Sequence, residues 1–249
     1  MSRVDFMGIP VDALTLSQTV DRILAMIEEG RHTQQVSINP AKVVQMVQSP
    51  EMRRIIRRCE TINIDGMSVV WMARLMGVPI PARVAGIDLM DSLVAKAAEH
   101  GLKPYFLGAR RDVVEQAVRK YREAYPALQV AGFRDGYFTA EEEQGIAEEI
   151  RDSGAHMLFV AIPSPKKEQF LGRWRDLMGV PYCMGVGGSL DVKSGKLTRA
   201  PVWMQENGLE WVHRLQQEPR KMLKRNAKDP PRFLLLAGIS MITGLVVPE

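Results

Sequence analysis

Apolar residues recur along this chain in two alternating patterns, as short runs and as longer stretches with helical spacing. The short runs predict buried strands at residues 34–38, 61–66, 104–108, 128–133, 156–162 and 182–186. The longer stretches predict helices at residues 15–29, 68–76, 87–100, 112–125 and 139–153, with two more that begin near residues 50 and 166. Strands and helices that alternate in this way favour a Rossmann-like α/β fold, in which helices wrap a parallel sheet.

Local capping signals support several of these helix ends. Thr15 with Gln18, and Thr139 with Glu142, have the spacing of a capping box at a helix N-terminus. Gly101 stands where the helix at 87–100 is expected to end, in the position that glycine favours.

The pattern changes after about residue 198, which divides the chain into an α/β core at 1–198 and a helical appendage at 199–249. The appendage has no clear strand, and its segment 214–232 carries seven Lys and Arg residues against two carboxylates. An apolar stretch at 233–247 follows, shorter than the ~20 residues that span a bilayer as a helix. A basic run beside an apolar tail favours contact with a polyanion or an anionic membrane surface, and a solvated helix face is the alternative.

Composition places the chain among globular proteins with a substantial core, at 249 residues, 46% hydrophobic and 25% charged. Cys59 and Cys183 match no metal-binding spacing, so we expect both to be reduced and buried, as in a cytoplasmic protein. Residues 1–11 show no evident signal peptide.

Asp65 is the first candidate for chemistry, because it follows the β-branched run at 61–64 and precedes Gly66. It is therefore predicted at the C-terminal end of a strand, which is where ligands bind in open parallel sheets. The alternative is that Asp65 only caps the next helix.

Several common sites are absent from the sequence. The glycines at 185–188 lack the third glycine of a dinucleotide fingerprint, and residues 194–197 resemble a P-loop only superficially. The four histidines have no metal-ligand spacing, and no two aspartates are separated by a single residue. A hard-cation site is thus not indicated, and phosphate would be bound by backbone amides, helix N-termini, Arg or Lys.

Groups that suit phosphate binding do follow the predicted strands. Gly108, Gly136 and the pair at 187–188 each come after a strand, and Lys166 and Lys167 stand at a helix start. Glycines in such loops are often purely structural, but their recurrence at successive strand ends favours an anionic ligand.

An ordered set of short motifs extends over nearly the whole chain. They lie at residues 39–40, 65–66, 83–89, 106–108, 125–126, 136–138, 187–192, 194–195, 199–201, 208–211, 214–215 and 218–221. In this combination the chain resembles the WecG/TagA/CpsF family of bacterial glycosyltransferases. The resemblance implies an inverting, metal-independent transfer, without a cofactor, of an N-acetylhexosamine or related hexose from a UDP-sugar. The acceptor would be a polyprenyl-diphosphate-linked saccharide, and the enzyme would associate peripherally with the inner face of the cell membrane.

The resemblance also implies roles for individual residues. Asp65 matches the proposed general base, and the acceptor pocket would include Ser37, where the family often has Thr, with Asn39, Arg83 and Asp88. The donor site would comprise Gly108, Ala109, Ser164, Lys167, Glu168, Gly187, Gly188 and Asp191. Arg214, Arg220 and Arg225 fall in the appendage that is thought to close over the site. Lys167 replaces a glutamine that is usual in the family, which leaves the donor sugar open.

Two other functions remain as alternatives. The basic run at 214–232 and the arginines at 53–58 would suit a nucleic-acid-binding protein, but no aromatic residues interleave them, so we expect no nucleic-acid partner. A nucleotide-sugar oxidoreductase is the other alternative, and the incomplete glycine motif speaks against it. The sequence leaves open the acceptor, a possible homo-oligomer, and whether the apolar tail packs on protein or lipid.

Overall fold

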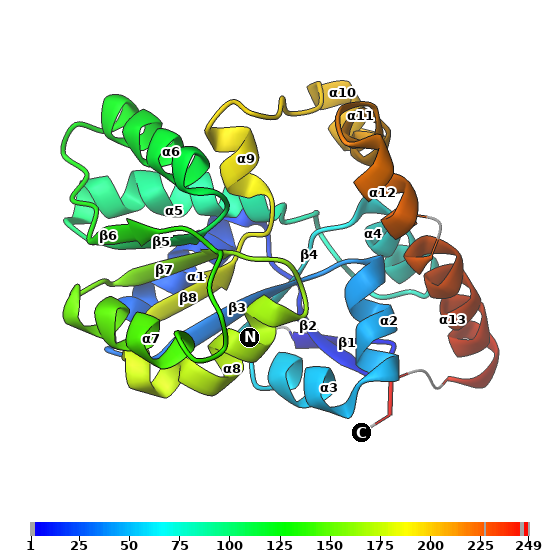
Figure 1. Ribbon diagram of the computed structural model, residues 1–249. Coiled ribbons are helices and arrows are strands. Elements are labelled where there is room, and N and C mark those ends of the chain that lie inside the picture. The colour runs from blue at the N-terminus through cyan, green and yellow to red at the C-terminus, as the bar shows by residue number, and fades with distance from the viewer. Residues whose placement is uncertain (1–2, 227, 245–246, 249) are drawn as a thin grey trace. The chain divides into compact units, whose positions relative to one another are not determined.

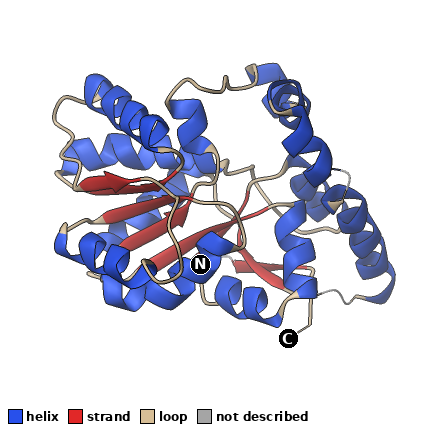
Figure 2. Ribbon diagram, viewed as in Figure 1, coloured by secondary structure: helices blue, strands red, loops and turns tan. Residues whose placement is uncertain are grey.

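The computed structural model describes residues 3–226, 228–244 and 247–248, and the side chains of residues 221 and 224–226 fall outside its description. Six strands form a parallel sheet in the order β4-β3-β8-β7-β5-β6 (Figure 1), and helices flank it (Figure 2). The sheet strands are β3 (Thr33–Ile38), β4 (Thr61–Ile64), β5 (Pro104–Gly108), β6 (Gly132–Arg134), β7 (Met157–Ala161) and β8 (Tyr182–Gly185). The predicted fold class is confirmed.

Helices connect and follow the strands. They are α1 (Leu16–Glu28), α2 (Pro40–Gln48), α3 (Pro50–Arg57), α4 (Met67–Leu75), α5 (Gly86–His100), α6 (Arg111–Ala124), α7 (Glu143–Asp152), α8 (Lys166–Met178), α9 (Ser189–Lys193), α10 (Val202–Glu206), α11 (Glu210–Gln217), α12 (Pro219–Asn226) and α13 (Asp229–Thr243). Proline opens both α2 and α3, where its missing N–H removes no intrahelical hydrogen bond. None of the described helices is long and apolar enough to cross a membrane.

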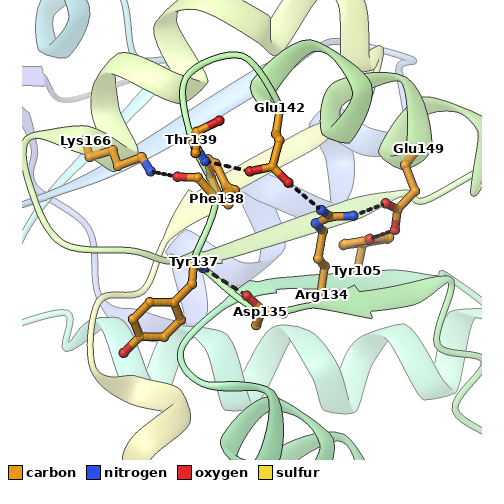
Figure 3. A network of polar contacts seen from close by, with 9 residues as sticks. All are labelled: Tyr105, Arg134, Asp135, Tyr137, Phe138, Thr139, Glu142, Glu149 and Lys166. Atoms are coloured by element: carbon orange, nitrogen blue, oxygen red, sulfur yellow. Dashed lines mark hydrogen bonds and ion pairs between the residues drawn. The ribbon is translucent and has the colours of Figure 1, made fainter.

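Two predicted elements begin clearly later in the structure than the sequence indicates. The strand expected at 128–133 is reduced to Gly132–Arg134, and the helix expected from 139 begins at Glu143. The Thr139 amide does donate to Glu142 Oε2 at 2.8 Å (Figure 3), which is one half of the predicted capping box. The predicted burial of Cys59 and Cys183 as free thiols is confirmed.

The antiparallel hairpin of β1 (Arg3–Phe6) and β2 (Ile9–Asp12) has no counterpart among the predictions. Its two-residue turn, Met7 and Gly8, has φ values of 55° and 76°. Positive φ at both positions is typical of the tight turns that suit hairpin twist.

The chain divides into two compact units. The second unit comprises Leu16–Val36 and Gly86–Leu197, and it holds most of the sheet. Within it α5, α6 and α9 lie on one side of the strands, and α7 and α8 lie on the other (Figure 1). The strand β7 is buried at every position, as the continuous apolar run at 157–161 predicts.

The first unit comprises Met1–Thr15, Ser37–Ala85 and Thr198–Glu249. It contains the hairpin, β4 and the helices α2 to α4, together with α10 to α13 from the C-terminal segment. Helix α13 lies against α2 and buries Phe233, Ala237 and Ser240, so part of the apolar tail packs on the protein itself.

A buried carboxylate joins the hairpin to β4. Asp12 is 4% exposed, and its Oδ2 accepts a hydrogen bond of 2.7 Å from the Ile62 amide. Its Oδ1 lies 3.2 Å from Arg3 Nε, and Arg3 Nη2 donates to the Cys59 and Glu60 carbonyls. Asp12 therefore fixes the strand that directly precedes Asp65.

We expect Asp12→Ala to destabilise the fold by about 1–3 kcal/mol, because the buried Ile62 amide loses its acceptor. Urea denaturation would measure this change. Asp5→Ala on the same hairpin is the matched control, since Asp5 accepts only an exposed hydrogen bond from Gly8. Equal stability of the two variants would contradict the role given to Asp12.

Candidate active site

Two backbone hydrogen bonds organise the C-terminal end of β4. The Asp65 amide donates to the Ile38 carbonyl, and the Val84 amide donates to the Ile64 carbonyl, both at 2.9 Å. Residues 38–39, 64–65 and 83–84 are therefore adjacent segments of backbone in the first unit. Asp65 thus lies at the C-terminal end of β4, as the strand pattern predicts, and the structure places Asn39 and Arg83 beside it.

The side chains at this edge have distinct local roles. Asn39 Oδ1 accepts the Lys42 amide at 3.1 Å and so caps α2, while Ser37 is partly buried near the end of β3. The N-cap residue of α4 is Gly66, so the cap position lies one residue beyond Asp65. Asp65 itself is partly buried, directly after a strand that is buried at all four positions.

The appendage reaches this edge through an ion pair that the sequence analysis missed. Arg83 Nη2 lies 3.1 Å from Glu210 Oε2 at the start of α11, and the Arg83 side chain is only 13% exposed. Nearby, Gly208 packs so closely on Trp71 of α4 that a Cβ there would lie 2.7 Å from the indole ring. The first turn of α11 is thus held against α4, which begins two residues after Asp65.

The three predicted appendage arginines differ in solvent exposure and in whether their side chains are described. Arg214 is partly buried on α11, and Arg220 is exposed on α12. The side chain of Arg225 lies outside the described residues.

In the second unit, the tight turn after β5 lies against the end of β7 and the loop after β6. Gly108 and Ala109 have φ values of 129° and 58°, and a Cβ on Gly108 would lie 2.5 Å from the Ala161 carbonyl carbon. The Gly136 amide donates to the Ala109 carbonyl at 2.9 Å, so the loop after β6 lies directly on this turn. Only glycine at 108 allows such a close approach between the ends of β5 and β7.

Lys167 lies across the end of β8. A Cβ on Gly185 would lie 2.9 Å from its Cε and 3.2 Å from its Nζ, so the side chain fills the space that glycine leaves. The Lys167 side chain is 14% exposed, and its Nζ is 3.6 Å from Oε1 of the buried Glu168. Ser164 lies just before this helix, in the exposed turn after β7.

The loop after β8 carries the last predicted donor residues. Gly187 has a φ of 54°, Gly188 is the N-cap of α9, and Asp191 pairs with Lys196 at 2.8 Å. Lys193 on the same helix lies 3.4 Å from Asp91 of α5 and over the Tyr121 ring of α6, so α9 is anchored to two neighbouring helices.

These placements separate the predicted site residues into two groups. Ser37, Asn39, Asp65 and Arg83 belong to the first unit with the appendage, whereas the predicted donor residues belong to the second. Asp88 lies in the first turn of α5, also in the second unit. Among the described residues, no three His, Cys, Asp or Glu side chains are grouped so that they could hold a metal ion.

Comparison with known proteins identifies the class of enzyme. Residues 4–244 match the model of the "Glycosyl transferase WecG/TagA/CpsF family". The chain is 34% identical over 191 residues to an N-acetylglucosaminyldiphosphoundecaprenol N-acetyl-beta-D-mannosaminyltransferase of Bacillus spizizenii (strain ATCC 23059 / NRRL B-14472 / W23). That alignment covers 76% of this chain and 74% of the relative. Because the family model matches nearly the whole chain and this relative is 34% identical, the chain belongs to the WecG/TagA/CpsF family of glycosyltransferases.

Proposed function

We propose that this glycosyltransferase moves an N-acetylhexosamine from a UDP-sugar to a polyprenyl-diphosphate-linked saccharide, with inversion and without a metal ion. The single observation that carries the proposal is the junction of Ile38, Ile64 and Val84, which presents a carboxylate and an arginine at one strand end. The acceptor class follows the name of the Bacillus relative, which transfers N-acetylmannosamine to an undecaprenyl-diphosphate-linked N-acetylglucosamine.

Asp65 is the proposed general base. It accepts the proton of the acceptor hydroxyl as the hydroxyl oxygen attacks C1 of the donor sugar and the bond from C1 to the diphosphate breaks. A single displacement of an α-linked leaving group forms a β-linked product, which is the configuration in the relative's name. The carboxylate needs no unusual proton affinity, because the proton moves late, as the oxocarbenium-like centre is captured.

Arg83 is the proposed partner of the acceptor diphosphate. A guanidinium binds phosphate oxygens through two parallel hydrogen bonds, and this one already holds a carboxylate, that of Glu210. Because Glu210 belongs to α11, an acceptor that binds Arg83 would also change how the appendage is held. The appendage would thereby respond to the lipid substrate.

Lys167 is the proposed partner of the donor diphosphate. Its Nζ lies near Gly185 and Gly187 at the carboxyl end of the sheet, which is where ligands bind in open parallel sheets. The negative charge that develops on the departing UDP would be stabilised by this ammonium group and by amides of the glycine turns.

The first unit is the proposed membrane-facing part. Of the large apolar side chains that are exposed in the described residues, all but Tyr137 lie in this unit. They are Trp71, Leu75, Val202, Trp203, Trp211, Leu223, Leu234, Leu235, Ile239, Met241 and Ile242. Tryptophan and leucine beside cations such as Arg220 and Arg232 are typical of surfaces that lie in a lipid interface. The enzyme would then act at the cytoplasmic face of the membrane, where its lipid-linked acceptor is held.

Asp65→Asn is expected to lower the rate of sugar transfer about 10²–10⁴-fold, because a positioned base contributes roughly that factor. The assay measures transfer from labelled UDP-sugars to a polyprenyl-diphosphate acceptor in EDTA. Unchanged melting temperature and UDP affinity would show that the variant is folded. More than half of the wild-type rate in Asp65→Asn, or a requirement for Mg²⁺ or Mn²⁺ in the wild type, would contradict the mechanism.

Gly185→Ala is expected to weaken UDP binding roughly 10- to 100-fold, because the new methyl group displaces Lys167 from the end of β8 and a charge-assisted hydrogen bond is lost. Calorimetric titration with UDP measures the effect. Lys167→Met should lose a similar factor, and the double variant should lose little more than either alone. Gly145→Ala is the control, since a Cβ there meets nothing within 4 Å. Full UDP affinity in Gly185→Ala would argue against Lys167 as the diphosphate partner.

Leu235→Asp with Ile242→Asp is expected to weaken binding to anionic vesicles at least about tenfold, because two exposed apolar side chains of α13 no longer enter the interface. Vesicle flotation in low and high salt measures this, and salt should weaken the wild type too. Tyr137→Ser in the second unit should have no effect. If wild-type binding to vesicles depended on neither lipid charge nor ionic strength, the proposal that the first unit faces the membrane would be refuted.

A further inference from the structure

Arg83 lies in a segment that cannot satisfy its own backbone. Residues 78–85, all of which the structure describes, form neither helix nor strand. Pro79 and Pro81 have no backbone N–H, so the carbonyls of this stretch need hydrogen-bond donors from elsewhere. The side chains of Ile80 and Val84 are nevertheless buried. The groups that hold this segment therefore decide where Arg83 lies.

The end of α4 brings the segment back beside the helix. The Val78 amide donates to the Ala73 carbonyl at 2.9 Å, and the Gly77 amide donates to the Arg74 carbonyl at 3.0 Å. Gly77 has a φ of 76°. These two hydrogen bonds with a left-handed glycine form a Schellman motif, which ends a helix and turns the chain. The residues that follow are thereby placed next to the last turn of α4.

The side chain of Arg74 holds the returning segment. Its Nε donates to the Ile80 carbonyl at 3.2 Å, and its Nη2 donates to the Pro81 carbonyl at 2.8 Å. A guanidinium is planar and has its donors in a fixed fork, so it fixes the direction of two successive carbonyls as well as their position. A lysine has no such fork and could not reproduce this geometry.

Arg83 thus lies between two fixed points of the backbone. Pro81 is held by Arg74 on one side, and the Val84 amide donates to the Ile64 carbonyl on the other. Only residues 82 and 83 lie between these points. The position of the Arg83 guanidinium is therefore set jointly by Arg74 and by β4.

The hold on this segment is at the surface. Arg74 is exposed, whereas the apolar side chains of the segment are buried. Loss of the guanidinium should therefore leave the core packed, because surface substitutions seldom change stability much. The change should be confined to Pro81 and the residues next to it. Since α4 begins two residues after Asp65, one helix connects the proposed base with the group that holds the Arg83 segment.

We propose that Arg74 is a positioning residue, which holds the segment of Arg83 in the geometry that binds the diphosphate of the lipid-linked acceptor. This inference rests on the proposed role of Arg83 and adds the group that sets its position. In this role Arg74 acts through Arg83 and does not itself contact the acceptor. A segment that is fixed before the acceptor arrives loses little conformational entropy on binding, which favours a higher affinity.

The test measures binding of farnesyl-diphosphate-linked N-acetylglucosamine, a short form of the proposed acceptor, to the full chain by calorimetric titration. Arg74→Gln should bind it about 3- to 30-fold more weakly, a factor typical of one or two lost hydrogen bonds. Arg74→Lys should recover part of this loss, because an ammonium can still donate to one carbonyl. The melting temperature and the affinity for UDP should stay close to those of wild type in both variants.

Arg54→Gln is the matched control, since Arg54 is an exposed arginine of α3 in the same unit. It removes the same charge and should leave acceptor affinity unchanged. An equal loss in Arg54→Gln and Arg74→Gln would overturn the proposal, because general attraction between cations and the diphosphate would then explain both.

A double-variant cycle with Arg83 separates positioning from a structural role. Arg83→Gln removes the group that is positioned, so Arg74→Gln should weaken binding little further in that background. If the two losses multiplied, Arg74 would act independently of Arg83, and the proposal would be overturned. An equal loss of UDP and acceptor affinity in Arg74→Gln would also overturn it, in favour of a general effect on folding.

The remaining outcomes distinguish this inference from the proposed function. If Arg83→Gln weakens acceptor binding and Arg74→Gln does not, the positioning role is wrong and the proposed function stands. If wild type does not bind the acceptor, or Arg83→Gln binds it equally well, the proposed acceptor or the role of Arg83 is wrong, and the positioning role is overturned with it.

Discussion

The structure depends most on the pair of backbone hydrogen bonds that fix the end of β4 between the chain after β3 and the segment before α5. One links Asp65 to Ile38 and the other links Val84 to Ile64, both at 2.9 Å. Three segments that are distant in sequence thereby lie side by side. Asn39 directly follows β3, Asp65 directly follows β4, and Arg83 precedes the residue that pairs with β4. Asp12 also stabilises this arrangement, because its carboxylate accepts a hydrogen bond from Ile62 in the same strand, β4. The position of the proposed base is therefore set by backbone pairing and one buried carboxylate, and not by a flexible loop.

In the second unit, the main constraint at the strand ends is the close approach of neighbouring groups to glycine residues. Gly108 meets Ala161, Gly136 meets Gly108, and Gly185 leaves room for Lys167. Gly108 leaves no room for a side chain, whereas a Cβ at Gly136 or Gly185 would require its neighbour to shift. These contacts bring amide groups and a cation to the carboxyl end of the sheet. These are the groups that a diphosphate requires when no metal is involved. The two units thus offer complementary groups, with a carboxylate and a guanidinium in one, and amides and an ammonium group in the other.

Much of this could be predicted from the sequence, because the strands and helices have strong apolar periodicity and marked ends. The strand at 104–108 was predicted at its exact bounds, and α3 begins at Pro50, where a helix start was predicted near residue 50. The hairpin at 3–12 was missed, since four-residue strands carry little periodic signal and their turn is Met-Gly, not the usual Asn-Gly. The ion pair of Arg83 with Glu210 and the contact of Lys167 with Gly185 could not be predicted from sequence spacing. Both contacts depend on how segments that are distant in the sequence pack together. Tyr137 was visible only as part of a family motif, and its exposure needed coordinates.

Hydrogen–deuterium exchange with each substrate alone would test the central claim most directly, namely that one unit binds the donor and the other binds the lipid acceptor. UDP should slow exchange in the loops of the second unit at 108–110, 135–138 and 185–191. A polyprenyl-diphosphate-linked saccharide should slow exchange at 37–40, 64–66 and 81–84, and change it at 208–214, where Glu210 leaves Arg83. Protection of the same segments by both ligands, or protection of the first unit by UDP alone, would contradict the division of labour proposed here.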